Sequence, residues 1–220
     1  MTMNIKNIND ELEDLRNKAK AAREELDMAV VFHEICKPVH HYTSAPAANS
    51  YASGTLNAVL VALRREMLAA LFRLWDRDKR TPGMESIADT LGDSAVIEAL
   101  VQNRMAPNLP QEADIGIRKA LQKDADKFIY LVNKYKQGGS QAHVLKRLRA
   151  LRNKKLAHRQ VLPSPGTGAS VTDQEIEEFY KDNKELVRIL VHLANAEAYD
   201  PNQTESVYRH AARQFWARVD

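Results

Sequence analysis

The spacing of apolar residues constrains the fold of this chain more than any other feature. Near the N-terminus, apolar side chains recur at steps of three and four residues, at Ile5, Ile8, Leu12, Leu15, Ala19, Ala22, Leu26 and Ala29. This period of about 3.5 residues is typical of a long helix that packs along its length against another helix. Alternation of apolar and polar residues is nowhere sustained for the length of a strand. The sequence therefore predicts an all-α protein with a long N-terminal helix.

The same helical spacing continues through the rest of the chain. Seven further helices are expected: a long one that ends before Pro82 and Gly83, short ones over residues 84–91 and 94–103, one through residues 117–135, one that starts at Ser140, one capped by Thr172 and Glu175, and one after Pro201. In the last helix, the spacing predicts a buried face formed by Tyr208, Ala211, Phe215 and Val219. The Pro- and Gly-rich stretch over residues 159–171 is expected to be a flexible loop.

The length of 220 residues fits a single domain over residues 1–220. Apolar residues make up 44% of the chain and charged residues 28%, a composition of globular proteins rather than of disordered chains or fibres. The longest purely apolar run, residues 58–63, is far too short to span a bilayer, so no membrane partner is expected. Cys36 is the only cysteine and cannot form an internal disulfide. We therefore expect a globular cytoplasmic protein.

Positive charge is concentrated in one part of the chain, although the net charge is only +3. Residues 127–172, the basic window, contain ten Lys and Arg residues and no Asp or Glu. The remaining 22 basic and 29 acidic residues give the rest of the chain a net charge of −7. A local basic field on an acidic body indicates a polyanionic partner, which we expect to be nucleic acid. A solvated basic face without a partner is the alternative.

Within the basic window, the stretch "ALRNKKLAHRQ", residues 150–160, places an arginine and a histidine on one predicted helix. At 100° and 1.5 Å per residue, Arg152 and His158 lie about 120° and about 9 Å apart, at the edges of an apolar stripe. One copy of the helix does not bring them together. Two copies related by a two-fold axis could place both arginines and both histidines in one cleft. The spacing therefore predicts a homodimer.

These residue types suit cleavage of RNA without a metal ion or another cofactor. Histidine titrates near neutral pH, so it can accept the proton of an RNA 2′-hydroxyl or donate one to the leaving oxygen. Arginine stays charged and can hold the phosphate and stabilise the transition state. The candidate catalytic residues are Arg152 and His158, with Asn153 orienting the phosphate or the imidazole. The candidate nucleic-acid-binding residues are the basic side chains around them: Lys146, Arg147, Arg149, Lys154, Lys155 and Arg159.

The stretch "LRNKKLAHR" resembles the signature of the HEPN superfamily (higher eukaryotes and prokaryotes nucleotide-binding). That signature is an arginine followed by a polar residue, with four to six residues between the arginine and a histidine. Arg152, Asn153 and His158 match it with five residues between the arginine and the histidine. The long first helix, the charged turn "RLWDRDKRTPG" and the chain length are similar to the abortive-infection U-type branch of the superfamily.

The resemblance implies a helical bundle of the HEPN type, with the long N-terminal helix and additional short helices. It also implies a homodimeric, metal-independent endoribonuclease whose site straddles the dimer interface. Such proteins often act as toxins or in phage defence, so a cognate antitoxin is a further expected partner. Members that pair with a nucleotidyltransferase antitoxin often carry a tyrosine two residues after the histidine as a modification target. Gln160 holds that position here, so adenylylation at this position is not implied.

Other interpretations of the sequence stay open. The basic surface could belong to a non-catalytic helical module that binds nucleic acid or a protein. The stretch "HEICKPVHH" holds five potential zinc ligands: His33, Glu34, Cys36, His40 and His41. It lacks the HExxH pattern, and His33 continues the spacing of the first helix, so packing at a helix end is favoured over metal binding. Asp76 and Asp78, among three arginines, could mark a second polar site, although a salt-linked helix end is favoured.

Overall fold

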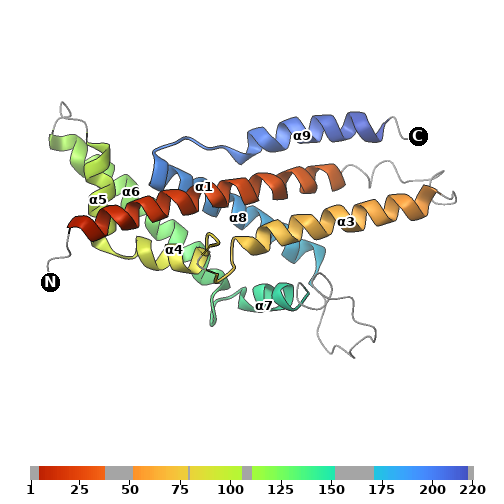
Figure 1. Cartoon of the computed structure of the whole chain (residues 1–220), viewed down its shortest axis with the longest axis horizontal. Helices are drawn as coiled ribbons and strands as arrows, with labels where there is room; N and C mark the ends of the chain where they lie inside the picture. Colours follow the sequence, from red (N-terminus) through yellow and green to blue (C-terminus); the bar gives the residue numbers. More distant parts are fainter. Residues whose placement is uncertain (1–4, 38–51, 79, 106–110, 152–170, 218–220) are drawn as a thin grey trace. The chain divides into compact units, whose positions relative to one another are not determined.

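A computed structural model describes residues 5–37, 52–78, 80–105, 111–151 and 171–217. These residues form α-helices and, within the ranges just given, no strand. The helices are α1 (Ile5–Cys36), α3 (Ala52–Arg73), α4 (Met84–Leu91), α5 (Ser94–Arg104), α6 (Gln111–Tyr135), α7 (Ala142–Leu151), α8 (Asp173–Asn195) and α9 (Pro201–Trp216) (Figure 1). The all-α prediction is confirmed. The loop predicted for residues 159–171 lies outside the described residues up to position 170.

The chain divides into two compact units. The first unit comprises residues 1–23 and 73–199, and the second comprises residues 24–72 and 200–220. Helix α1 therefore contributes its first part to one unit and its last part to the other. The single domain over residues 1–220 stays a prediction. Of the helices that the structure describes, none combines the length and the apolar character needed to cross a membrane.

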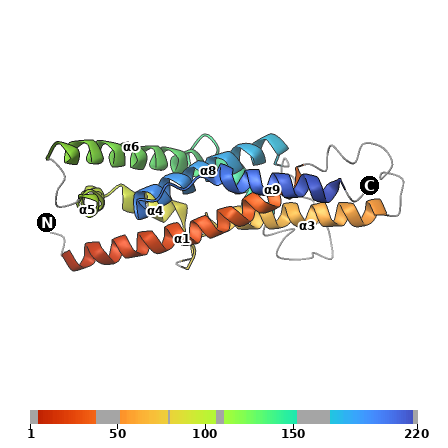
Figure 2. The ribbon, with the colours of Figure 1, turned by 90° about the horizontal axis from the view of Figure 1, so that it is seen from above.

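Helix α6 is the centre of the first unit, since it packs against α4, α5, α7 and α8. Figure 2 shows α6 and α8 lying side by side. The buried side chains follow the predicted apolar spacing on both helices: Leu121, Phe128, Leu131, Val132 and Tyr135 on α6, and Ile176, Phe179, Leu186, Val187, Leu190 and Leu193 on α8. The first part of α1 adds the predicted seam residues Leu12, Leu15, Ala19 and Ala22, which are also buried. Removal of these apolar surfaces from water is the main force that holds the unit together.

Three aromatic rings lie in this core, with their centroids 5.4 Å apart for Trp75 and Tyr135, 5.9 Å for Trp75 and Phe179, and 5.1 Å for Tyr135 and Phe179. The indole Nε1 of Trp75 donates a hydrogen bond to the side-chain oxygen of Asn183 at 2.8 Å, and Asn183 donates to the Phe179 carbonyl at 2.7 Å. The Tyr135 hydroxyl donates to Asp182 at 2.7 Å. In the part of the chain described, every buried side-chain nitrogen and oxygen has a hydrogen-bond partner. Such satisfied polar groups specify one arrangement of the core.

Local sequence signals set the helix ends. The backbone N–H of Thr172 donates to a Glu175 carboxylate oxygen at 2.8 Å, and the Thr172 hydroxyl accepts from the Glu175 N–H at 3.2 Å. The predicted capping box of α8 is therefore confirmed. Asp200 caps α9, and Pro201 occupies the first turn. Gly83 precedes α4 with a φ of 63°, a left-handed conformation that side chains with a Cβ rarely adopt.

The second unit consists of the last part of α1 with α3 and α9, which run side by side (Figure 1). Trp216 of α9 is 5% exposed, and its indole Nε1 donates to the Ile35 carbonyl of α1 at 2.9 Å. Ala212 lies one turn earlier on the same face. Leu56 and Leu60 of α3 pack against this pair. The contacts of Ala212 and Trp216 thus join α9 to α1 and α3.

The predicted buried face of the last helix is wrong. That face was Tyr208, Ala211, Phe215 and Val219. Tyr208 and Phe215 are 38% and 58% exposed, Ala211 is exposed, and Val219 lies outside the described residues. Ala212 and Trp216 are buried instead. The two stripes differ by one position and have the same period, so the spacing alone does not choose between them; the hydrogen bond of Trp216 and the ion pair of Arg209 with Glu34 of α1 favour the observed face.

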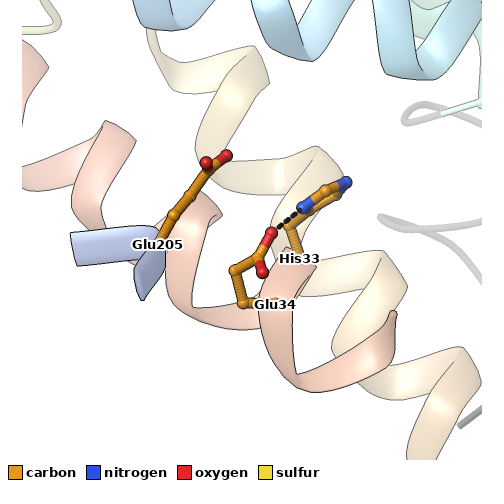
Figure 3. Close-up of side chains that lie close together, drawn as sticks. All are labelled: His33, Glu34 and Glu205. Carbon is orange, nitrogen blue, oxygen red and sulfur yellow. Dashed lines mark hydrogen bonds and ion pairs between the residues drawn. The ribbon is translucent and has the colours of Figure 1, made fainter. Parts of the chain in front are cut away.

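Glu34 is the buried charged group of the second unit. Its carboxylate is 0% exposed, lies 2.9 Å from His33 Nδ1 and accepts a hydrogen bond from Arg209 Nε at 2.7 Å. Burial alone would raise the pKa of Glu34, but the hydrogen bonds from His33 and Arg209 and their charges lower it to about 2. Glu205 of α9 pairs with the same arginine, at 3.5 Å. Figure 3 shows His33 and Glu34 on adjacent positions of α1, with Glu205 beside them.

The Glu34 cluster makes the stability of the protein depend on pH. Because the pKa of Glu34 is about 2 in the folded protein against an ordinary 4.5, its stabilising contribution is complete above pH 4.5 and is lost as the pH falls toward 2. The contribution is on the order of 3 kcal/mol. Urea unfolding of wild type and Glu34→Gln at several pH values should show a less stable variant at pH 7 and a difference that shrinks below pH 4.5. A difference independent of pH would contradict this assignment.

Candidate nucleic-acid interface

Helix α7 leads directly into the predicted motif. Its inner face is formed by Val144, Leu145 and Leu148, which are at most 1% exposed, and it packs against α6. The helix is described as far as Leu151. The predicted catalytic and binding residues that follow lie outside the described residues: Arg152, Asn153, Lys154, Lys155, His158 and Arg159. The structure therefore describes the helix that enters the motif and the chain from position 171 onward.

Arg147 is bound to the first turn of α8. Its guanidinium Nη2 lies 2.6 Å from Glu175 Oε1, and the side chain is only 26% exposed. His143 Nε2 lies 3.3 Å from the same oxygen, while Glu175 Oε2 closes the capping box with Thr172. The Thr172 N–H, and then Arg147 and His143, lower the pKa of Glu175. This carboxylate therefore links the end of one helix to the start of the next.

Arg149 is bound on the other side of α7. Its Nη2 donates to the backbone carbonyl of Trp75 and to Glu85 Oε1, both at 3.2 Å, and its side chain is 34% exposed. Glu85 belongs to the first turn of α4. Trp75 is the same residue whose indole bonds to Asn183 of α8. The position of α7 is thus fixed to the aromatic core by a charge-assisted hydrogen bond as well as by its apolar face.

The basic window is matched by an acidic stripe on α8, which consists of Glu175, Glu178, Asp182 and Glu185 at steps of three and four residues. Lys134 lies 2.7 Å from Asp182 and 3.0 Å from Glu178, Lys127 lies 2.5 Å from Glu185, and Lys136 lies 2.9 Å from Asp89 of α4. Of the basic residues of the window that the structure describes, only Lys146 lacks such an acidic partner, and it is exposed. Acids of α8 and α4 therefore offset most of the positive charge in the described part of the window.

Two partners of the basic window were missed as site residues, namely Glu85 and Glu175. Glu175 was predicted only as a helix cap. The four acids at helical spacing, directly after a stretch without any acid, were the available signal for pairing between helices. Glu85 gave no such signal, because it is separated from Arg149 by 64 positions and the contact depends on the tertiary fold.

The potential metal ligands of α1 form an ion cluster with α9. Among the described residues, ligand atoms of His33, Glu34 and Glu205 lie within 4.8 Å of one another, which is a spacing a metal ion could bridge. Arg209 already contacts both carboxylates and offsets part of their charge without an ion. Cys36 is partly buried, and burial raises the pKa of its thiol, which disfavours the thiolate that binds metals. His40 and His41 lie outside the described residues.

A family comparison agrees with the resemblance stated from the sequence and with the helical fold. The family model described as AbiU2, of the HEPN superfamily, matches residues 5–215. The chain belongs to the AbiU2 family. This assignment places it in the HEPN superfamily and associates it with abortive infection. No curated protein and no solved structure matched the chain.

In this AbiU2 protein, a pocket of about 460 Å³ lies in the first unit beside the contacts of Arg149 with Trp75 and Glu85. It is lined by Asp14, Lys18, Trp75, Asp76, Arg77, Asp78, Thr81, Pro82, Gly83, Glu85, Ser86 and Asp89. Asp78 binds Arg80 through two hydrogen bonds at 2.8 and 3.0 Å, and Arg77 pairs with Glu85 at 3.2 Å. These pairs fit the favoured interpretation of the charged turn as a salt-linked helix end.

The hydrogen bond between Trp75 and Asn183 is testable through the stability of the AbiU2 fold. Trp75→Phe removes the indole N–H and leaves the buried Asn183 oxygen without its donor, which should lower the free energy of unfolding by about 1–3 kcal/mol, with a further loss from the smaller ring. Urea unfolding measures this change. Adding Asn183→Leu should restore part of the loss, because both polar partners are then absent. A single variant as stable as wild type would contradict the role of this bond.

Proposed function

We propose that this AbiU2 protein is a metal-independent endoribonuclease of the HEPN type, with a composite active site at a homodimer interface. The observation that carries the proposal is the motif of Arg152, Asn153 and His158 in a chain that belongs to the AbiU2 family over residues 5–215. The anchoring of α7 by Arg147 and Arg149 supports it, because a catalytic group needs a rigid element to hold its position.

In the proposed reaction, the 2′-hydroxyl of RNA attacks the adjacent phosphorus, and the 5′-oxygen of the next nucleotide leaves. His158 accepts the proton of the hydroxyl or donates a proton to the leaving oxygen. Two copies of His158 in one cleft would supply both the base and the acid. Arg152 binds the phosphate and stabilises the charge of the transition state, and Asn153 orients the reacting groups. The products are a 2′,3′-cyclic phosphate and a 5′-hydroxyl.

We assign the electrostatic attraction of RNA to the motif and to the basic residues next to it in the sequence. Lys127, Lys134 and Lys136 are paired with acids, so they contribute little to an open positive field. Lys146 is exposed, and Lys154, Lys155 and Arg159 lie next to the catalytic residues in the sequence. Contacts of this kind bind phosphates without reading the sequence. We therefore expect tight, salt-dependent binding at the motif and little specificity from these side chains.

The association of the family with abortive infection points to a cellular role as a toxin or a phage-defence effector. Cleavage of cellular RNA in the cytoplasm would stop growth and so limit phage replication. A protein with such an activity needs control in healthy cells, and we propose a cognate antitoxin as the controlling partner. Gln160 leaves no tyrosine two residues after His158, so this control does not rely on adenylylation there.

The purified protein should cleave RNA in the presence of EDTA and leave 2′,3′-cyclic phosphate ends. His158→Ala should lower the turnover of RNA by roughly 100-fold or more, because general acid–base catalysis typically contributes 10²- to 10⁴-fold. Gel analysis of cleaved RNA with identification of the ends measures both effects. Expression of the wild type, but not of the His158→Ala variant, should arrest cell growth.

Equal RNA turnover in wild type and His158→Ala would contradict catalysis by the motif. Retention of RNA binding in that case would leave a non-catalytic binding module as the function. Arg152→Ala would then weaken binding in a way that depends on salt, while His158→Ala would leave binding intact. Salt titrations of the two variants with labelled RNA distinguish these outcomes.

A further inference from the structure

We propose that Arg147 and Arg149 are positioning residues for the motif, acting through Glu175 and Glu85, and do not bind RNA. This inference rests on the proposed ribonuclease function and changes the role that the sequence predicted for the two arginines. Lys146, the residue before Arg147, is exposed, whereas the side chains of Arg147 and Arg149 are only 26% and 34% exposed. The side chain of Lys146 is thus open to solvent, while those of Arg147 and Arg149 bind carboxylates of other helices.

The pair of Arg147 and Glu175 connects the chain before the motif to the chain after it. Arg147 lies four residues from the end of α7, and Glu175 lies in the first turn of α8. The two oxygens of Glu175 have separate partners: Oε1 is 2.6 Å from Arg147, and Oε2 accepts from the Thr172 N–H at 2.8 Å. The ion pair therefore acts on a carboxylate whose orientation is already fixed by the cap. Such a pair defines the distance between the two helices that enclose residues 152–170 in the sequence.

Arg149 fixes the opposite side of the same helix. Its guanidinium reaches a backbone carbonyl at Trp75 and a carboxylate at Glu85, both at 3.2 Å. Trp75 is 2% exposed, and its indole is bonded to Asn183. These two contacts occupy Nη2 of Arg149 and hold its guanidinium against the carbonyl and the carboxylate. Arg147 and Arg149 thus connect α7 to α8 on one side and to the segment that leads into α4 on the other.

The two possible roles of Arg147 predict opposite effects of a change at Glu175. If Arg147 bound RNA, loss of the Glu175 charge would release it and strengthen RNA binding. If Arg147 positions the motif, the same change would loosen α7 and slow the chemical step. Glu175→Gln is suitable because glutamine also serves in a capping box, so the cap of α8 is kept while the charge is removed. The effect then reports on the contacts of the Glu175 charge with Arg147 and His143 rather than on the cap.

The experiment is steady-state RNA cleavage by full-length wild type and Glu175→Gln, with kcat and KM measured separately. A misplacement of about 1 Å at a reacting group can cost 100-fold, so we expect kcat to fall roughly 10- to 100-fold and KM to stay within about twofold. Arg147→Gln should give the same loss. The double variant should lose little more than either single variant, because the two residues act as one unit.

Two variants serve as controls. Glu177→Gln makes the same substitution two residues away on α8, where Glu177 pairs with Lys181 of its own helix at 3.7 Å, and it should leave kcat and KM unchanged. Lys146→Gln should raise KM and reduce the salt dependence of RNA binding without changing kcat. Hydrogen exchange of the α7 amides should be faster in Glu175→Gln than in Glu177→Gln, and the thermal unfolding of each variant shows whether the fold is kept.

Unchanged kcat or tighter RNA binding in Glu175→Gln, with an active wild type, would overturn the positioning role and leave the proposed function intact. A wild type without RNA turnover would contradict the proposed function itself. Arg147→Lys gives a last distinction, since lysine keeps the charge near Glu175 but not the geometry of the guanidinium. Partial recovery of kcat relative to Arg147→Gln is expected for a positioning ion pair.

Discussion

The hydrogen bonds of Trp75 are the interactions on which the arrangement of the first unit depends. Its indole donates to Asn183 inside α8, and its backbone carbonyl accepts from Arg149 of α7. Its ring lies against Tyr135 of α6 and Phe179 of α8. Trp75, in the turn that follows α3, therefore connects α6, α7 and α8. Because the groups are buried and satisfied, any shift of α7 would leave a polar atom without a partner, which is costly in a core.

Charge pairing explains how a strongly basic stretch can be part of a stable fold. The acids of α8 lie opposite the lysines of α6 and the arginine of α7, so charges of opposite sign meet where the helices pack. The pKa of Glu185 is lowered to about 2 by Arg188 of its own helix and then by Lys127 of α6. The neutralised part of the basic window supports the fold. The positive charge assigned to RNA binding is thereby confined to Lys146 and to residues that follow α7 in the sequence.

Much of the fold could be predicted from the sequence because helical periodicity is a local signal. The seam of α1 and the capping box of Thr172 and Glu175 were confirmed. The predicted buried face of α9 was wrong, because two stripes one position apart satisfy the same period and the choice depends on contacts with Ile35 and Glu34.

The contacts of Arg147 and Arg149 with acids of other helices could not be predicted from the sequence, since their partners lie 28 and 64 positions away. The sequence pattern of a basic helix does not distinguish a side chain that meets a phosphate from one that meets a carboxylate. The resemblance to the family was found from the sequence and is confirmed, while the motif of Arg152 and His158 and its chemistry stay predictions.

The ribonuclease site that we propose is complete only when two copies of the chain meet. The most direct test is complementation between two inactive variants, Arg152→Ala and His158→Ala, carried on separately tagged chains and purified together as a mixed dimer. A shared cleft would contain one intact arginine and one intact histidine, from different chains. If the site is shared, the mixed dimer should cleave RNA in EDTA, while each variant alone should not. A mixed dimer that forms but remains as inactive as its two parents would contradict the shared site.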